Sequence, residues 1–401
     1  MSKTIIRLYF IILLFIPMLS GCWDSLDLEK RATILSIAID KADPDANVEH
    51  ITHFKEESSS TDQEMIRLTA QISVPGRIPL GPETGGGEKE PVWVLTSYGH
   101  TLEDALLNLQ QELADDLFLG HLRIIVISEE LAKEGVERFN DYLRRQPEVR
   151  RTAWLAISKE EAAKYMDIAP KLERVPALYL TSMVSNAVNL GKFPNDTIGL
   201  FWRTLSSKGK DAYLPYLEIR ENENVQINGL AYFKGDKMLG KIDPIEIGLY
   251  MAVVGEKEGG YGALVKIPGT NDEVLIRAVR RKSEINSKIK NGKPNIHVKI
   301  RYESEIQENE SVTTELNNEK VLRQLEKQAN KDTKKNVEKL INTLKSKESD
   351  VFGFGEYIRA KHPIYWKREI QTKENWATFY KDLDVSVEVD SHIRGVGIKA
   401  K

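Results

Sequence analysis

The sequence predicts a protein of the α+β or mixed α/β class, with mixed sheets, three domains and a long helix in the last domain. Three patterns predict this class. Strand and helix signals alternate between residues 92 and 158, short strands with tight turns follow between residues 212 and 282, and a long amphipathic helix precedes a terminal strand. Alternation is typical of α/β layers, whereas separate runs of strands and helices are typical of α+β domains. We expect domain limits near residues 205 and 282.

The expected N-terminal domain covers residues 22–205. Residues 32–39 predict a strand buried on both faces, and residues 65–74 predict a second strand. Four prolines and five glycines between residues 75 and 91 indicate a hairpin connection, although a binding loop has a similar composition. The next elements are expected as a strand at 92–97, a helix opened by a capping box of Thr101 and Asp104, a strand at 122–128, a helix at 135–145, a strand at 152–158, and helices at 175–190 and 197–207.

The expected middle domain, residues 206–282, is rich in strands, and the last domain covers residues 283–401. Strands are predicted at 225–233, 238–242, 261–267 and 273–281, with one helix at 244–253. In the last domain we expect a strand at 295–302, a helix at 314–347 and a strand at 383–393. The apolar stripe of the long helix is expected to pack on a sheet, although a partner protein would also cover it; the stripe comprises Val321, Leu322, Leu325, Ala329, Val337, Leu340, Ile341 and Leu344.

Composition places the chain among globular proteins and argues against a polyanion binder. Charged residues make up 29% and hydrophobic residues 41% of the chain, as in ordinary globular domains. The 57 basic and 60 acidic side chains give a net charge of −3. Loss of residues 1–21 would remove two basic residues and change this charge to −5. Such a balance predicts neither nucleic acid as a partner nor polybasic docking to a membrane.

Cys22 is the single cysteine, and its position predicts a lipid anchor. Lys3 and Arg7 precede an apolar segment at 8–19, which is shorter than the roughly 20 residues of a membrane-spanning helix. Small residues then lead to the cysteine, as at a signal-peptide cleavage site. We predict that residues 1–21 are a cleaved signal peptide and that Cys22 becomes an S-diacylglycerol, N-acylated cysteine held in membrane lipid. An ordinary secretory signal with an incidental buried thiol is the alternative.

Motifs of catalysis and cofactor binding are missing from the sequence. It has no Gly-x-Ser-x-Gly elbow, no His-Glu-x-x-His pair and no phosphate-binding loop, so we predict a non-enzyme without cofactor or metal. His50 and His53, beside Glu49, Glu56 and Glu57, are a candidate zinc pair. The stretch has the character of a strand or loop, which would separate the two rings, so we favour an exposed surface.

Two further clusters have a functional and a structural interpretation. Arg144, Arg145, Arg150 and Arg151 could meet lipid phosphates or an acidic partner, but a solvated helix end is the interpretation we favour. An aromatic concentration near the end could anchor an interface, although a core beneath the long helix is the commoner fate of such residues. It comprises Tyr365, Trp366, Trp376, Phe379 and Tyr380.

An ordered series of motifs resembles the Ger(x)C family of spore germination lipoproteins. The series begins with Gly21-Cys22-Trp23-Asp24 and spans essentially the whole mature chain. The other matching stretches are Ser97-x-Gly99-x-Thr101-x-x-Asp104-Ala105, Gly120-His121-x-Arg123, Arg145-x-x-Glu148-x-Arg150, Asn228 to Lys234, and Asp350-x-Phe352-Gly353-Phe354-Gly355 with Pro363-x-x-Trp366-Lys367 and Trp376.

The resemblance implies a subunit of a nutrient germinant receptor and a fold of three mixed α/β domains. It implies a non-enzymatic C subunit on the outer surface of the spore inner membrane, acting as a scaffold or coupling subunit with the membrane-embedded A and B subunits. By residue, only Cys22 carries over with a defined role. A solute-binding lipoprotein that captures a small molecule in a cleft is the main alternative, and a surface hydrolase is a third.

Overall fold

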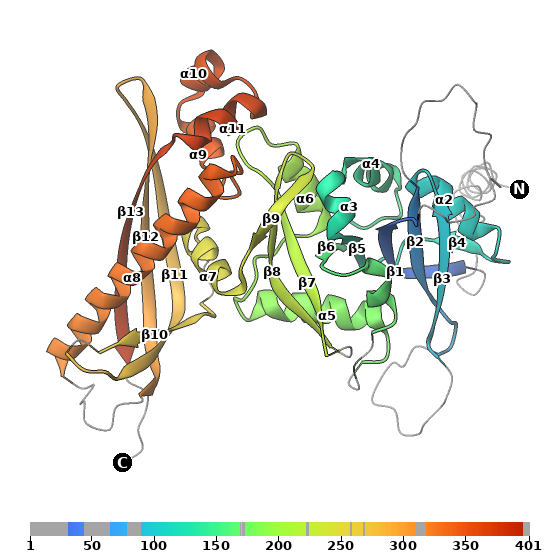
Figure 1. The fold of residues 1–401 in the computed structure, drawn as a ribbon, viewed down its shortest axis with the longest axis horizontal. Coiled ribbons are helices and arrows are strands. Elements are labelled where there is room, and N and C mark those ends of the chain that lie inside the picture. The colour runs from blue at the N-terminus through green and yellow to red at the C-terminus, as the bar shows by residue number, and fades with distance from the viewer. Residues whose placement is uncertain are drawn as a thin grey trace, which may run out of the picture.

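The computed structural model describes residues 31–43, 65–77, 90–168, 170, 173–221, 224–256, 259–267, 269–309 and 318–395. The molecule is elongated (Figure 1), with a large mixed sheet toward the N-terminal end and a small mixed sheet at the other end. Helices pack on both sheets. This arrangement confirms the predicted α+β class with mixed sheets.

The large sheet contains nine strands, with β1 (Arg31–Lys41) in its interior. Along the sheet the order is β3-β2-β1-β5-β6-β7-β8-β9, and β4 pairs separately with β1. The strands from β1 through β5 and β6 to β7 run parallel, whereas the outer pairs are antiparallel. The other strands are β2 (Ile66–Ser73), β3 (Val92–Gly99), β4 (Asp116–Phe118), β5 (Ile124–Ser128), β6 (Trp154–Ser158), β7 (Tyr213–Arg220), β8 (Asn224–Lys234) and β9 (Lys237–Ile242).

Helices cover both faces of the large sheet, which explains why β1 is buried at nearly every position. The side chains of Ile37 and Ile39 belong to one core, and that of Ala38 belongs to the core on the opposite face. The first core is closed by α2 (Leu102–Gln110), α3 (Glu129–Glu134), α4 (Glu137–Arg145) and α6 (Ile198–Leu205). The second is closed by α5 (Pro176–Asn189) and the 3₁₀ helix Ala162–Met166.

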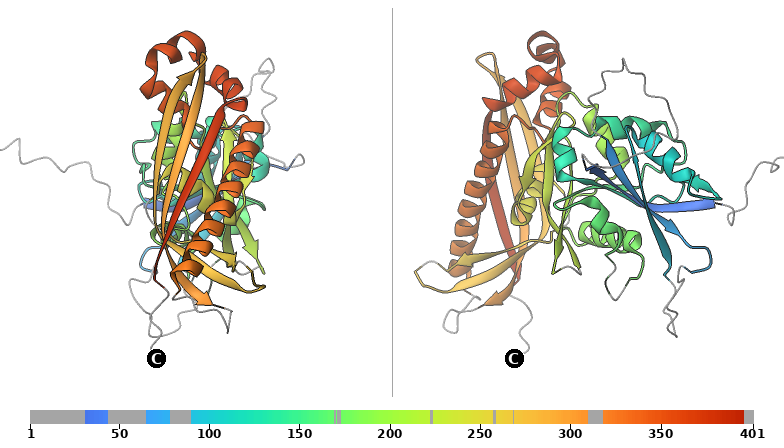
Figure 2. Two further views of the ribbon diagram at one scale, coloured as in Figure 1. Left: turned by 90° about the vertical axis from the view of Figure 1, so that its left-hand side faces the viewer. Right: turned by 45° about the vertical axis from the view of Figure 1, so that its right-hand side comes forward.

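The small sheet has the order β10-β11-β12-β13, and the long helix α8 (Glu319–Ser346) lies along it (Figure 2). Its strands are β10 (Gly262–Lys266), β11 (Glu273–Lys290), β12 (Lys293–Asn309) and β13 (Asp384–Gly395). The apolar stripe of α8 packs on this sheet, as predicted: Val337 and Leu340 share a core with Ile296 and Val298 of β12. Along β13, buried or half-buried residues alternate with exposed polar ones, as in a sheet with one solvated face.

Helix α7 (Pro244–Val254) lies between the two sheets, and the helices after α8 gather at one end of the small sheet (Figure 1). They are α9 (Phe354–Lys361), α10 (Pro363–Tyr365), a π-helical turn at Trp366–Ile370, and α11 (Lys373–Lys381). Trp366, Trp376 and Tyr380 are buried, and Tyr365 and Phe379 pack partly buried against the same core. The aromatic concentration is therefore core, the interpretation that the sequence favoured.

Several elements differ from the predicted ones. The helix predicted at 135–145 is confirmed as α4, but the short helix α3 before it was not predicted; Gly135, with φ = +132°, ends α3. The strands predicted at 273–281 and 295–302 extend into one long hairpin, and its turn at Asn291 and Gly292 has positive φ at both residues. The short strand β4 and the strand β7 were missing from the prediction. The connection 78–89 lies outside the described residues, but β2 and β3 pair as the predicted hairpin.

The large sheet continues past residue 205. Strand β7 pairs with β6 on one side and β8 on the other, so strands of the expected N-terminal and middle domains share hydrogen bonds. A further core contains residues of β7 and β8 together with residues of β12 and α8. The three-domain division stays a proposal.

Candidate functional site

Two of the predicted sites lie outside the described residues. These are Cys22, the predicted lipid attachment site, and the pair His50 and His53 with its neighbouring glutamates. Within the described ranges, no group of three or more histidine, cysteine, aspartate or glutamate side chains is arranged to hold a metal ion. No helix in those ranges has the length and hydrophobicity needed to cross a bilayer.

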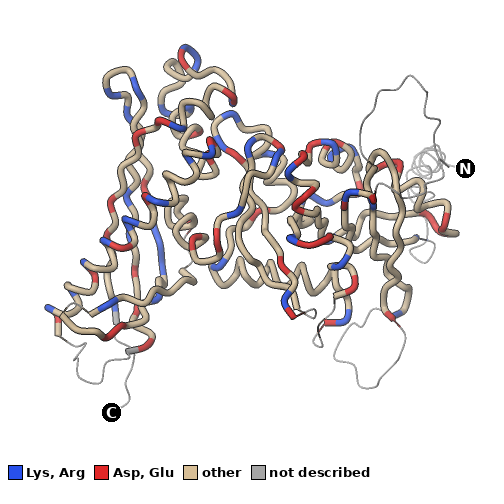
Figure 3. The backbone as a smooth tube through the Cα atoms, in the orientation of Figure 1, with Lys and Arg blue, Asp and Glu red and all other residues tan. Residues whose placement is uncertain are grey.

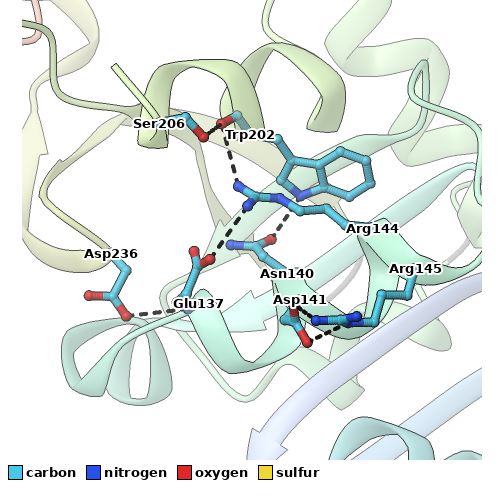
Figure 4. A network of polar contacts seen from close by, with 8 residues as sticks. All are labelled: Glu137, Asn140, Asp141, Arg144, Arg145, Trp202, Ser206 and Asp236. Carbon is cyan, nitrogen blue, oxygen red and sulfur yellow. Dashed lines mark hydrogen bonds and ion pairs between the residues drawn. The ribbon is translucent and has the colours of Figure 1, made fainter. Parts of the chain in front are cut away.

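Two arginines of the predicted cluster, Arg144 and Arg145, lie at the end of α4 and contact different partners (Figure 4). Arg145 forms an ion pair with Asp141 on the same helix, with Nε and Oδ2 2.9 Å apart. Arg144 turns toward α6, where it donates to the Trp202 carbonyl (3.4 Å), and its guanidinium also lies 3.5 Å from Glu137 of its own helix. The Trp202 indole in turn donates to the Asn140 amide oxygen (3.2 Å).

Arg144 and Arg145 therefore have partners within the protein. Arg144 also lies over the Trp202 ring, with 5.7 Å between the guanidinium carbon and the ring centroid. Arg151, beyond the end of α4, is exposed, as is Arg150. The pairing of two of the four arginines within the protein supports the helix-end interpretation over a phosphate site.

The motif that begins at Ser97 forms the junction between β3 and α2. Thr101 caps the helix, because its hydroxyl accepts a hydrogen bond from the Asp104 backbone N–H (3.1 Å). The Asp104 carboxylate accepts from the His100 N–H (2.8 Å), one residue earlier than in the predicted capping box. Ser97 donates to the Ala105 carbonyl (2.7 Å). A Cβ at Gly99 would lie 2.4 Å from the Ala105 nitrogen, so only glycine fits there.

The motifs around Gly120 and Glu148 also shape the backbone locally. The Glu148 carboxylate accepts a hydrogen bond from the Leu119 N–H (2.9 Å), which fixes the chain before β5. A Cβ at Gly120 would lie 2.2 Å from the Phe118 ring. In both cases, a motif residue positions the backbone rather than presenting a reactive group.

The motif that begins at Asp350 is held together by several buried hydrogen bonds. The buried Asp350 carboxylate accepts four hydrogen bonds: from the N–H groups of Gly353 (2.9 Å), Phe354 (3.1 Å) and Gly355 (2.8 Å), and from the Trp376 indole (3.0 Å). It thereby caps α9 and joins it to α11. We call the surrounding cluster the Asp350 joint; it comprises Gly209, Asp211, Asp350, Gly355 and Trp376.

The Asp350 joint connects the C-terminal helices to the large sheet. The backbone N–H of Asp211, two residues before β7, donates to the Asp350 carbonyl (2.9 Å), and the Asp350 N–H donates to the Asp211 carboxylate (2.9 Å). The Asp211 carboxylate also pairs with Lys373 of α11 (3.2 Å). Gly209 and Gly355 meet backbone to backbone, since a Cβ on Gly355 would lie 2.5 Å from the Trp376 ring and 2.7 Å from the Gly209 Cα.

Burial raises the pKa values of two aspartates, Asp350 and Asp196. It raises the pKa of Asp350 to about 7; the neighbouring Asp211 acts in the same direction, and the donated hydrogen bonds act against it. Burial also raises the pKa of Asp196 to about 8, although Lys210 and Arg203 oppose this. One Asp196 carboxylate oxygen has no hydrogen-bond partner among the described residues. The sequence did not single out Asp196, because nothing in the surrounding residues distinguishes it from an exposed loop aspartate.

A pocket of about 360 Å³ lies between α7, α8 and the small sheet. Its size falls within the range of small-molecule sites. Its apolar lining includes Ile245, Leu249 and Leu264, and its polar lining includes Asp332 and Asn336 of α8.

Two family models of spore germination proteins together match most of this chain. The model of the spore germination protein N-terminal domain matches residues 24–219, and the model of the spore germination B3/GerAC-like C-terminal domain matches residues 228–397. Spore germination protein KC of Bacillus subtilis (strain 168) is 26% identical over 410 residues, covering 97% of this chain and 95% of the relative.

Spore germination protein GerQC of Bacillus cereus is 26% identical over 331 residues, covering 82% of this chain and 89% of the relative. A crystal structure of the GerBC protein matches with a TM-score of 0.53 at 18% identity, over 83% of this chain and 95% of that chain. That likeness shows a shared fold.

Proposed function

Because this chain belongs to the Ger(x)C family of spore germination proteins, we propose that it is the C subunit of a nutrient germinant receptor and acts there as a scaffold or coupling subunit. The main support is that two family models together match residues 24–219 and 228–397. The relatives that match nearly end to end are named for spore germination, which supports a role in the same process. The role proposed is non-enzymatic.

We propose that Cys22 holds the protein on a membrane. Its position behind a basic and apolar leader supports S-diacylglycerol and N-acyl modification after cleavage. Two or three acyl chains give persistent attachment, because each buried methylene contributes about 0.8 kcal/mol. Such an anchor would confine the body to the outer surface of the spore inner membrane and raise its effective concentration beside the A and B subunits.

The Asp350 joint supports a coupling role. Gly209 and Asp211 lie just before β7 of the large sheet, whereas Asp350, Gly355 and Trp376 belong to the segment packed on the small sheet. A displacement of one sheet would therefore be transmitted to the other through buried hydrogen bonds rather than absorbed by a solvated linker.

The proposal predicts that Cys22→Ala abolishes lipid attachment and impairs germination. Loss of the thiol removes the only nucleophile that can be alkylated at the cleavage site, so the precursor should persist unprocessed or be released. Purification from spore membranes in mild detergent, with a mass measurement on the N-terminal peptide, tests this. The wild-type protein should copurify with A and B subunits and carry an acylated Cys22.

A second candidate is direct capture of a small molecule, which the pocket between α7 and α8 favours. This function predicts that a ligand raises the melting temperature of the isolated protein, by an amount that grows with ligand concentration. Recovery of an acylated protein without other receptor subunits, together with such a shift, would favour capture over coupling. Copurification without any shift would favour coupling.

A further inference from the structure

One end of the small sheet brings together two segments that are far apart in the sequence. The turn between β11 and β12 lies beside the short helices that follow α9 (Figure 2). The Tyr365 hydroxyl donates to the Gly292 carbonyl (3.1 Å), and His362 Nε2 lies 3.1 Å from the Ser287 carbonyl oxygen. We call this end the basic tip; it comprises residues 286–294 and 356–369.

The basic tip has a net charge opposite in sign to that of the whole chain. It contains seven lysine or arginine and two glutamate side chains, a net charge of +5, whereas the chain carries −3. Both glutamates are paired within the tip, Glu356 with Arg359 and Glu369 with Arg368, each at 2.6 Å.

The other five basic side chains are exposed, and no described carboxylate pairs with any of them. Lysine and arginine mark both the hairpin turn and the adjacent helices in Figure 3. The five are Lys288, Lys290, Lys293, Lys361 and Lys367.

An apolar side chain protrudes among these lysines. Ile364 is 79% exposed, the highest value among the large hydrophobic side chains of the described residues. It lies in the single turn of α10, between Pro363 and the partly buried Tyr365. Single exposed hydrophobic residues are common on soluble proteins. Here, however, the residue stands at the end of the molecule, in a segment rich in unpaired positive charge.

We propose that the basic tip binds the surface of a membrane that contains anionic phospholipids. The lysines would face headgroup phosphates, and Ile364 would enter the interface beneath them. Lysine ammonium groups are compact charges on flexible stems, which suits headgroups without a fixed geometry. Each lysine close to an anionic bilayer raises partitioning about fivefold, and a neighbouring apolar side chain adds to this. The overall composition hides this surface, because acidic residues elsewhere outweigh the tip.

Vesicle binding by the chain from residue 23 onward tests the proposal. This form retains every described residue and has neither signal peptide nor Cys22, so the result does not depend on lipid modification or receptor partners. It should sediment with vesicles of phosphatidylcholine and phosphatidylglycerol, and not with phosphatidylcholine alone. Replacing Lys288, Lys290 and Lys293 with glutamine should lower partitioning roughly 100-fold.

A matched variant separates local contact from net charge. Lys327, Lys331 and Lys335 on α8 are exposed and have no described ion-pair partner; their replacement by glutamine changes the net charge equally and should leave partitioning within about threefold. In the same chain, Ile364→Cys creates a unique thiol. An environment-sensitive fluorophore there should shift to the blue only with anionic vesicles.

Three results would overturn the proposal: equal losses in the two triple variants, equal binding to neutral and anionic vesicles, or no binding at all. The last result would direct attention to an acidic protein surface as the occupant of the tip. Loss of receptor copurification with intact vesicle binding would contradict the proposed function and leave this inference standing.

Discussion

Four hydrogen bonds converge on the Asp350 carboxylate, two on each oxygen. Asp350→Asn replaces one of these oxygens with an NH₂ group, which cannot accept, so two buried donors lose their partner. We expect a loss of about 2–4 kcal/mol in the free energy of unfolding. Denaturant unfolding followed by circular dichroism measures this loss.

Asp390→Asn is the matched control, because Asp390 is exposed on β13. It should change the free energy of unfolding by less than about 0.5 kcal/mol. Similar losses in the two variants would show that the Asp350 contacts do not stabilise the joint.

Asp196 predicts an unusual dependence of stability on pH. Its pKa is raised from 3.8 to about 8 by burial, so the folded state holds this proton more tightly than the unfolded state. The resulting stabilisation is complete below the unfolded pKa and is lost as pH rises toward 8. Asp350, with its pKa raised to about 7, acts in the same direction. The melting temperature should therefore fall between about pH 5 and pH 8.

The variant Asp196→Asn tests the assignment. The amide resembles the protonated acid and cannot ionise, so the variant should be more stable than the wild type at about pH 8, by roughly 1–3 kcal/mol, and should show a smaller pH dependence. A pH dependence identical in wild type and variant would remove Asp196 as its origin.

At the scale of elements, prediction succeeded where the sequence signal is local. The stripe of α8 has a clear helical period, and the apolar runs of β1 and β5 match strands buried on both faces. Tight turns punctuate the strands β8 and β9. In each case, the pattern within one segment is sufficient to define the element.

The prediction missed strands whose formation depends on pairing with residues elsewhere in the chain. The end of β11 and the start of β12 that form the hairpin tip are rich in exposed lysines, and they become strands through their mutual hydrogen bonds. Strand β7 begins where helical segments end, and it adopts its place because β6 and β8 lie on either side.

The residues of the candidate site were likewise only partly predictable from the sequence. The sequence singled out Asp350, Gly355 and Trp376 as motif residues, but Gly209 and Asp211, which lie more than a hundred residues earlier, could not be connected to them. The basic tip was equally hidden, since its charges come from two segments that only the fold brings together. The residue pattern of a single segment does not predict contacts with a distant segment.

At the scale of the whole molecule, one core contains residues from both sheets. Leu230 of β8 belongs to it together with Ile296 and Ile300 of β12, and residues of α7 and α8 complete it. Because the two sheets share this core, we expect them to unfold in one cooperative transition, although chains of this length often unfold in steps.

Hydrogen exchange read by mass spectrometry measures this cooperativity. Peptides from β5 and from β12 should become exchangeable with the same dependence on denaturant. In Gly355→Ala, the added Cβ would lie 2.5 Å from the Trp376 ring, so the joint should open and the small sheet should exchange first. Two separate transitions in the wild type would contradict the expectation.

The place of β1 also has a mechanical consequence. If the chain is tethered through Cys22, a pull from the bilayer reaches β1 through Arg31, its first residue, and β1 is bonded to β2, β4 and β5. Tension along this strand loads its ladders in shear, so many hydrogen bonds must break together rather than one after another. Resistance to such a load is set by the rate of unfolding and not by equilibrium stability. The body would thus remain folded while its tether bears transient force.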